Sequence, residues 1–316
     1  MPLISFIIPS FNLPSDYLLE CVKSILALPL SEQEREIILI DDGSDTNQLE
    51  SLGDLKNQVL FIRQKNSGLS AARNRGIELC TGRFIQFVDG DDALVKEAYA
   101  HCIDIIKNDS DADFIKFQMT SNKPSATSLH DDHPVTGTTY MRHNNLQASA
   151  CSYLFKKSIL GELRFTNGIY HEDEEFTPLL MIRSERLIAT NAPAYSYRKR
   201  PNSITQSIDT STILKRLDDK QQVLLRLYDI ACHQHTDSRT ALLRRVYQLE
   251  MDYIYNVITD TRSSQQLEQR IAALSNAGLF PLAKANYTSK YKWFRRMSKS
   301  KAGRHILLAT LPHLKA

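Results

Sequence analysis

The sequence of 316 residues lacks a long hydrophobic run. No stretch approaches the ~18–20 uninterrupted apolar residues that a membrane-spanning helix needs. Residues 1–8 also lack the basic start and the cleavage site of a secretory signal peptide, and their apolar character is typical of a buried strand. We therefore expect a cytoplasmic protein that touches the inner face of the membrane only peripherally, if at all.

Motifs built on cysteine or glycine are missing as well. The five cysteines form no C-x-x-C pair, which leaves zinc and thiol-redox motifs unsupported and predicts reduced thiols. Neither G-x-G-x-x-G nor G-x-x-x-x-G-K-[ST] occurs, so dinucleotide-binding and P-loop functions lose their main support. The content of 42% hydrophobic and 24% charged residues is ordinary for a folded protein and excludes a disordered chain.

Acidic residues are absent after Glu268. The net charge is +3, but nine basic residues lie between Lys284 and the C-terminus, which leaves a net charge of −6 on the first 283 residues. In this tail, Tyr291, Trp293 and Phe294 are interspersed with lysine and arginine, a pattern that suits contact with an anionic membrane surface. The alternative is a terminal helix with a solvated basic face. The acidic body carries no nucleic-acid-binding motif, so we expect no nucleic-acid partner.

Hydrophobic periodicity divides the chain into two regions. In the first, strand patterns alternate with helical patterns, which predicts an α/β fold with a mostly parallel sheet flanked by helices. From about Thr210 onward the pattern is helical. We therefore predict one domain over residues 1–208 and an α-helical C-terminal region, with the basic tail, over residues 209–316. The expected strands are 3–9, 36–40, 59–63, 83–88 and 114–119, and the expected helices are 16–28, 70–79 and 96–107.

Polar clusters follow three of the expected strands, at residues 9–12, 41–45 and 89–92. In parallel α/β sheets, ligands bind at the carboxyl ends of the strands. Because three separate strands end in polar residues, the sequence predicts a functional site at one rim of the sheet.

The most informative cluster is Asp89-Gly90-Asp91-Asp92. Three carboxylates in four residues repel one another, and a cation would relieve that repulsion. Oxygen ligands suit Mg²⁺ or Mn²⁺, which are commonly held by one or two carboxylates together with substrate phosphates. Aspartate and glycine also favour solvated turns, so the cluster alone leaves both interpretations open.

Two other segments carry weaker signals. Asp42 follows a strand and is placed to accept a hydrogen bond from a nucleobase or a ribose hydroxyl, although its neighbours also suit a turn. Gly68 precedes a helix whose first N–H groups suit a phosphate, and Arg73 lies one turn further along. Many helices begin in this way, and Arg73 is equally compatible with a surface position.

The order and spacing of these motifs resemble the nucleotide-sugar domain of the family 2 inverting glycosyltransferases, which have the GT-A fold. The resemblance covers roughly residues 1–205. It is carried by Pro-Ser-Phe-Asn at residues 9–12, ILIDDGSDT at 38–46 and NSGLSAARNRGIELCTGRFIQFVDGDD at 66–92.

The resemblance implies a donor site with roles for matching residues. Pro9 and Phe11 would lie beside the nucleobase, with Phe11 in place of the usual tyrosine. Asp42 would bind the base, most often uracil, and Arg73 would lie near the nucleotide or its diphosphate.

The resemblance also assigns the acidic cluster and a later basic segment. Asp89 and Asp91 are the ends of a D-x-D motif, with Asp91 the favoured ligand of Mn²⁺ or Mg²⁺, and Asp92 would lie close to the donor sugar. A segment similar to the family's Y-x-Y-R-x-R-x-x-S-I-T places Arg200 and Ser203 over the diphosphate. The alternative for that segment is a structural pairing with the acidic cluster.

On the acceptor side, the segment from His171 to Phe176 resembles the family's E-D-x-x-F motif. The resemblance implies a general base here, because a carboxylate must take the proton of the attacking hydroxyl as the new bond forms. Asp173 is the favoured base and Glu172 the alternate. The other interpretation is that these acids only cap the following helix, where its dipole favours negative charge.

The sequence thus predicts a metal-dependent inverting glycosyltransferase of the bacterial polysaccharide type. The expected donor is a nucleotide-sugar, with a UDP-sugar of a hexose or N-acetylhexosamine favoured, and the acceptor is a glycan or lipid-linked saccharide. One alternative is a catalytically inactive homologue that binds a sugar nucleotide or a glycan. Another is a nucleotidyltransferase, which would normally show a basic, glycine-rich loop near the N-terminus; residues 9–14 contain no Gly, Lys or Arg.

Overall fold

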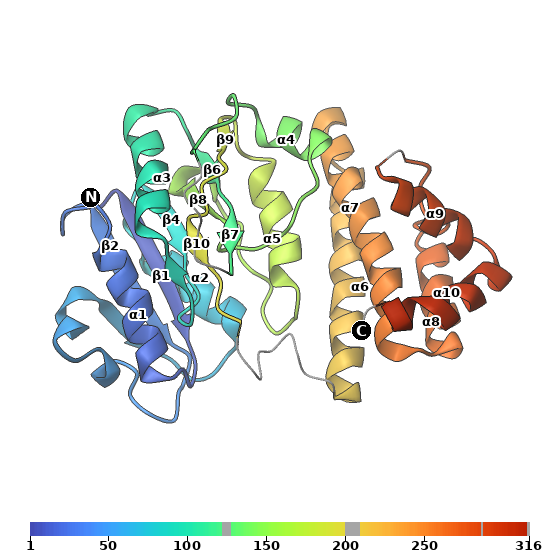
Figure 1. Cartoon of the computed structure of the whole chain (residues 1–316), viewed down its shortest axis with the longest axis horizontal. Coiled ribbons are helices and arrows are strands. Elements are labelled where there is room, and N and C mark those ends of the chain that lie inside the picture. Colours follow the sequence, from blue (N-terminus) through green and yellow to red (C-terminus); the bar gives the residue numbers. More distant parts are fainter. Residues whose placement is uncertain (122–127, 200–208, 286, 315–316) are drawn as a thin grey trace. The chain divides into compact units, whose positions relative to one another are not determined.

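The computed structural model describes residues 1–121, 128–199, 209–285 and 287–314 (Figure 1). The chain divides into two compact units, Met1–Ser203 and Ile204–Ala316. The predicted boundary between residues 208 and 209 lies at the edge of segment 200–208, outside the described residues, and stays a prediction.

The strands and helices expected in the first third of the chain are all present, with ends shifted by at most three residues. The elements of the N-terminal unit are β1 (Ile4–Ser10), α1 (Ser15–Leu26), β2 (Arg35–Asp41), the 3-10 segment Glu50–Gln58, β3 (Leu60–Arg63), α2 (Leu69–Leu79), β4 (Phe84–Phe87), β5 (Ala93–Leu94), α3 (Lys96–Asn108), β6 (Phe114–Lys116), β7 (Met119–Thr120), α4 (Gly137–His143), β8 (Tyr153–Lys156), the 3-10 turn Lys157–Ile159, α5 (Glu172–Met181), β9 (Leu187–Ala189) and β10 (Tyr195–Ser196).

In the described part of this unit, the larger sheet has seven strands in the order β3-β2-β1-β4-β8-β6-β9. Strands β1 to β4 run parallel, and Ile7 of β1 pairs with Ile38 of β2 and with Phe87 of β4. Strand β8 runs antiparallel to β4 and β6, whereas β6 and β9 are parallel. Every residue of β1 is buried, as expected for an apolar run covered on both faces. The structure therefore confirms the mostly parallel sheet.

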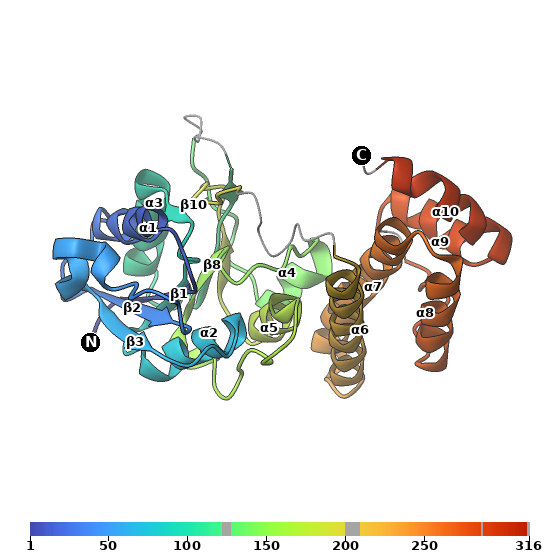
Figure 2. The same ribbon diagram turned by 90° about the horizontal axis from the view of Figure 1, so that it is seen from below.

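Helices cover both faces of this sheet, with α1 and α3 on one face and α2 on the other (Figure 2). Successive residues of β1 point to opposite faces. The Phe6 ring packs against Tyr99 of α3, with ring centres 6.0 Å apart, whereas Ile7 faces α2. A Cβ atom at Gly76 of α2 would lie 2.2 Å from Ile7 Cγ2. Glycine therefore lets α2 approach β1 more closely than any other residue would.

Among the described residues, a second sheet of three strands has the order β5-β10-β7. Strand β5 directly follows the polar residues after β4, and β10 pairs antiparallel with it, so that Tyr195 lies opposite Leu94. This pairing brings a segment from the end of the unit to the predicted rim.

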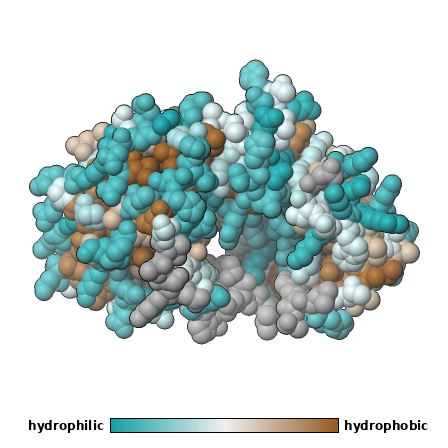
Figure 3. All heavy atoms as spheres, turned by 45° about the horizontal axis from the view of Figure 1, so that its top comes forward, coloured by the Kyte–Doolittle hydropathy of each residue, from teal (hydrophilic) through white to brown (hydrophobic). Residues whose placement is uncertain are grey.

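The C-terminal unit is helical, as predicted. Its core includes Val223 and Leu249, and Arg304 forms two hydrogen bonds of 2.7 and 2.6 Å with the carboxylate of Glu268. In the described part of the chain, no helix combines the length and hydrophobicity needed to cross a membrane. Figure 3 draws one face of the whole chain, and hydrophilic residues predominate on it. The helices are α6 (Thr210–Cys232), α7 (Thr236–Asn256), which continues into the π-helical turn Val257–Thr261, α8 (Ser264–Asn276), α9 (Ser289–Ser298) and α10 (Lys301–Leu314).

Candidate active site

The acidic turn, residues 89–92, connects β4 to β5 at the carboxyl end of β4. The Asp92 N–H donates to the Asp89 carbonyl at 2.9 Å and closes the turn. Asp89 and Asp91 are partly exposed, whereas Asp92 is only 2% exposed. The predicted cluster therefore presents two carboxylates toward solvent and buries the third.

Arg73 of α2 joins the acidic turn to α5. Its Nη2 donates to Asp89 Oδ1 at 2.9 Å, and its Nη1 donates to Glu172 Oε1 at 2.8 Å. The side chain is buried, and its guanidinium lies 5.3 Å from the centre of the Phe165 ring. Burial disfavours the charged guanidinium, but the carboxylates, Asp89 first, outweigh this effect and raise the pKa of Arg73. One cation thus holds together two groups of carboxylates that sequence reasoning had singled out separately.

Both oxygens of Asp92 are occupied by hydrogen bonds. Tyr195 Oη donates to Oδ2 and the Arg198 backbone N–H donates to Oδ1, each at 2.7 Å. Tyr195 is fully buried and also accepts the N–H of Asp89 at 3.1 Å. Burial and repulsion by Asp89 raise the pKa of Asp92 to about 7 in spite of these bonds. These hydrogen bonds therefore connect β10 and Arg198 to the acidic turn. The contact of Asp92 with a donor sugar stays a prediction.

Arg198 is a site residue that sequence reasoning missed. Its Nε donates to the Asp91 carbonyl at 2.9 Å, and its guanidinium pairs with Glu20 of α1 and lies 4.4 Å from the centre of the Tyr17 ring. The sequence signal for it is the Y-x-Y-R segment, in which the resemblance points to Arg200 and Ser203 instead. Those two residues lie outside the described part of the chain.

Asp42 stabilises the loop that leads into α2. Its Oδ1 accepts hydrogen bonds from Gln64 Nε2 at 2.7 Å and from the Ser67 N–H at 2.9 Å, and its Oδ2 accepts the Gly68 N–H at 2.7 Å. Gly68 directly precedes α2 and has a φ of 91°, a left-handed conformation that glycine adopts without strain. Asp42 is thus buried and already bonded to protein donors, and its contact with a nucleobase stays a prediction.

Pro9 and Phe11 lie at the end of β1. Pro9 is buried opposite Ile40 of β2, whereas Phe11 is 48% exposed. Asn12 follows with a φ of 47°, and its side chain exchanges two hydrogen bonds with Asp45, of 3.0 and 2.8 Å. These bonds join the loops after β1 and β2 and leave Phe11 as an exposed aromatic ring at the rim.

The acids of residues 172–175 form the first turn of α5, where the helix dipole favours negative charge. Glu172 is bound to Arg73, and Glu175 accepts the Thr166 hydroxyl at 2.7 Å. Asp173 is partly exposed and makes no ion pair among the described residues. Desolvation by the surrounding protein and the carboxylates of Glu172 and Glu174 raise the pKa of Asp173 well above its usual range. Glu172 and Asp173 are therefore neighbours with different electrostatic surroundings.

The acidic turn offers few protein ligands for a metal. Within the described residues, no group of three or more His, Cys, Asp and Glu side chains is arranged to hold a metal ion. Mg²⁺ and Mn²⁺ sites with one or two carboxylates take their other ligands from phosphates and water, and the partly exposed Asp89 and Asp91 suit such a site. Burial first, and then the charge of Asp89, raise the pKa of Asp92, and a divalent cation would neutralise part of that negative charge. The oxygen donors present thus fit Mg²⁺ or Mn²⁺.

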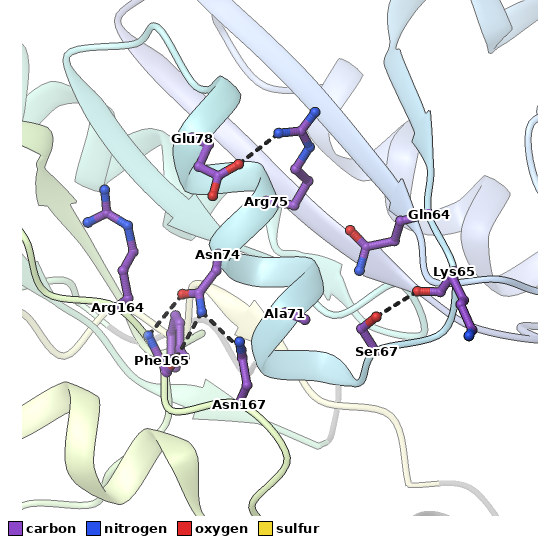
Figure 4. Close-up of a pocket in the computed structure, with 10 residues that line it drawn as sticks. All are labelled: Gln64, Lys65, Ser67, Ala71, Asn74, Arg75, Glu78, Arg164, Phe165 and Asn167. Atoms are coloured by element: carbon purple, nitrogen blue, oxygen red, sulfur yellow. Dashed lines mark hydrogen bonds and ion pairs between the residues drawn. The ribbon is translucent and has the colours of Figure 1, made fainter.

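A separate pocket of about 510 Å³, which we call the α2 groove, lies along the exposed face of α2 (Figure 4). One wall is formed by α2, including Asn74 and Arg75, and the others by the loops before α2 and before α5. No residue of the acidic turn lines it. The polar residues of the two loops that face it include Gln64, Lys65, Arg164 and Asn167.

Comparison with known proteins gives matches along most of the chain. The family model described as Glycosyl transferase family 2 matches residues 5–161. The uncharacterized glycosyltransferase EpsJ of Bacillus subtilis is 30% identical over 254 residues, which cover 72% of this chain and 70% of that protein.

Solved structures give the same fold. S. aureus TarS 1-349 in complex with UDP-GlcNAc has a TM-score of 0.70 at 16% identity, covering 99% of this chain and 91% of that chain. Mannosyltransferase PcManGT from Pyrobaculum calidifontis, in complex with GDP-Man and Mn²⁺, has a TM-score of 0.58 at 13% identity, covering 99% and 88%. These similarities confirm the predicted fold class.

Proposed function

This chain belongs to the family 2 glycosyltransferases, and we propose that it moves a sugar from a nucleotide-sugar to a hydroxyl group of a glycan or a lipid-linked saccharide, with inversion at the anomeric carbon. The observation that supports this most is the position of Arg73, which contacts Asp89 at 2.9 Å and Glu172 at 2.8 Å. The two groups of carboxylates are thereby close together, as a direct displacement between donor and acceptor requires.

On the donor side, we assign the nucleobase to Phe11 and Asp42, next to Pro9. A UDP-sugar of a hexose or N-acetylhexosamine is the favoured donor, supported by the complex of TarS with UDP-GlcNAc. Arg200 and Ser203 are assigned to the diphosphate. Arg73 would orient Asp89 toward it, because the guanidinium fixes one oxygen of that carboxylate.

We assign a divalent metal to Asp91, with Asp89 beside it. The complex of PcManGT with GDP-Man and Mn²⁺ supports this assignment. When bound, Mn²⁺ or Mg²⁺ would neutralise charge on the departing diphosphate. Asp92 would lie behind these residues, close to the donor sugar.

On the acceptor side, we assign Asp173 as the general base and keep Glu172 as the alternate. Glu172 Oε1 already accepts a hydrogen bond from Arg73 Nη1 at 2.8 Å, so this oxygen is occupied. The pKa of Asp173 is raised above its usual range, which makes its carboxylate a stronger base. It would take the proton of the acceptor hydroxyl while that oxygen bonds to the anomeric carbon. The bond from this carbon to the diphosphate breaks, and the nucleoside diphosphate leaves.

The test is a panel of nucleotide-sugars with Mn²⁺, with and without a chelator, scored for release of nucleoside diphosphate. Release that depends on the metal supports the proposal. Release of pyrophosphate would instead favour a nucleotidyltransferase. If no donor is turned over, the result would favour an inactive homologue.

Asp173→Asn should bind the donor and lose transfer, whereas the matched Glu174→Gln should keep most of it. Near-normal transfer by Asp173→Asn would remove Asp173 as the base.

We also propose that the C-terminal unit contacts the anionic inner face of the membrane. In α9, Tyr291 and Phe294 are buried, whereas Lys292 and Trp293 are exposed, Trp293 by 50%. Ile306 of α10 is 51% exposed, and neither helix contains an acidic residue. Exposed cations beside a tryptophan suit an anionic lipid surface.

Sedimentation with lipid vesicles tests this contact. The full chain should bind phosphatidylcholine vesicles that contain phosphatidylglycerol and bind pure phosphatidylcholine weakly. Lys292→Ser combined with Trp293→Ser should reduce that binding, whereas Lys56→Ser combined with Leu60→Ser, an exposed pair in the other unit, should not. Equal binding by the two double variants would contradict the proposal.

A further inference from the structure

The α2 groove has a size and composition that suit a ligand different from the nucleotide. Its volume of about 510 Å³ lies within the range of small-molecule sites. Two amide groups on its lining, Gln64 Oε1 and Asn167 Nδ2, have no hydrogen-bond partner among the described residues. Its one aromatic residue, Phe165, is buried with its ring stacked on Phe176 at 3.8 Å. Amide groups can both donate to and accept from the hydroxyl groups of sugars.

The groove also carries positive charge without a counterion. The Lys65 side chain is exposed, and its ammonium has no hydrogen-bond or ion-pair partner among the described residues. Arg164 is exposed and uses one guanidinium nitrogen for the carbonyls of Gly161 and Leu163, at 2.9 and 2.8 Å, without an acidic partner in the described chain. The remaining cation, Arg75, is paired with the one lining acid, Glu78, at 2.7 Å. In Figure 4, Lys65 and Arg164 lie toward opposite ends, with α2 between them.

The wall between these cations is fixed. Asn74 Nδ2 donates to the Phe165 carbonyl at 2.9 Å and to Asn167 Oδ1 at 3.2 Å, and Asn74 Oδ1 accepts the Phe165 N–H at 2.9 Å. The same loop is bound to α5, because the Thr166 hydroxyl donates to Glu175 at 2.7 Å. The groove is therefore built partly from the segment that leads to Asp173.

We propose that the α2 groove binds a saccharide that carries carboxylate or phosphate groups, as a part of the acceptor remote from the reacting hydroxyl. This inference rests on the proposed transfer for its biological use. Two separated cations would bind two acidic groups along an extended chain, and Gln64 Oε1 and Asn167 Nδ2 would contact its hydroxyls. Such remote contacts add binding energy and orient the acceptor.

Isothermal titration calorimetry of the full chain tests the groove without any donor. The probe is an unsulfated chondroitin tetrasaccharide, and chitotetraose is the neutral control of equal length. We expect the acidic probe to bind more tightly than the neutral one, and added salt to weaken it because the cations are exposed. Lys65→Ser combined with Arg164→Ser should lose about five- to tenfold in affinity, the effect of two exposed ion pairs.

Matched variants separate the groove from general charge and from folding. Lys56→Ser combined with Lys96→Ser removes the same charge from exposed positions outside the groove and should bind like the parent. Arg164→Lys keeps the cation and should retain most of the affinity even if it changes the loop contacts. Equal affinity for the neutral probe, no binding of the acidic probe, or equal losses in both double variants would overturn the proposal.

Titration of the same samples with UDP and Mn²⁺ distinguishes this inference from the proposed function. The single variant Arg164→Ser should bind UDP like the parent, because Arg164 lies outside both the acidic turn and the loop before α2 that Asp42 stabilises. If UDP fails to bind while the tetrasaccharide binds through Lys65 and Arg164, the donor assignment is wrong and the groove is correct.

Discussion

Glu250 in α7 makes the stability of the C-terminal unit depend on pH. Its side chain is fully buried, and both carboxylate oxygens lack a hydrogen-bond partner among the described residues. Burial raises its pKa to about 8, from an ordinary value of 4.5. Between these values the folded unit holds a proton that the unfolded chain releases, so the free energy of unfolding falls as the pH rises. At about 1.4 kcal/mol per pH unit, the loss between pH 5 and pH 7 is about 3 kcal/mol.

Urea unfolding at pH 5, 6 and 7 measures this loss. The emission of Trp293, the single tryptophan in the sequence, reports on the same unit. Glu250→Gln keeps the shape but cannot ionise, so its unfolding free energy should lose most of the pH dependence. Asp229→Asn, at a side chain that is 76% exposed, should keep the slope of the parent. A parent whose stability is constant or rises over this range, or a Glu250→Gln variant with the parent's slope, would refute the reasoning.

Three further predictions concern the N-terminal unit. Tyr195→Phe removes a buried hydroxyl with two hydrogen bonds and should lower the unfolding free energy by about 2–4 kcal/mol. The control Tyr153→Phe loses one buried hydroxyl contact and should lower it by about 1 kcal/mol. Urea unfolding followed by circular dichroism compares the two variants, and equal losses would argue against the role of Tyr195. Burial and the carboxylates of Glu172 and Glu174 raise the pKa of Asp173, and only its ionised form can act as the base. We therefore expect kcat/KM to fall as the pH drops through a value well above the usual aspartate range. A kcat/KM that stays constant down to pH 5 would contradict this. Gly76→Ala places a Cβ 2.2 Å from Ile7 Cγ2 and should lower the free energy of unfolding by about 1–3 kcal/mol through overpacking. Thermal unfolding measures this loss, and an unchanged midpoint would mean that α2 can shift without cost.

The rim of the sheet could be predicted because its signals are local. A strand is read from an apolar run such as β1, and the polar residues that end it mark its carboxyl end. Since parallel strands share an edge, the segments after β1, β2 and β4 had to meet there. The acidic turn was found in this way, and the structure places it next to the end of β1.

The contacts across the site could not be predicted, because they join residues far apart in the sequence. The pairing of β10 with β5 brings Tyr195 to Asp92, and no local pattern specifies that register. The sequence shows only that Arg73 lies near the start of a predicted helix, whereas its contact with Glu172 depends on how α2 and α5 pack. The α2 groove was missed for the same reason, since its walls come from three separate segments.

The three protein hydrogen bonds to Asp42 have a consequence for recognition of the donor. A carboxylate offers about four acceptor directions, and Gln64, Ser67 and Gly68 use three of them. One direction is therefore not used by these protein donors. A nucleobase N–H that uses it would meet an acceptor already held in place by the loop, so little conformational entropy would be lost when it binds. The selectivity for the base would then depend on the rigidity of the loop before α2 as much as on Asp42 itself.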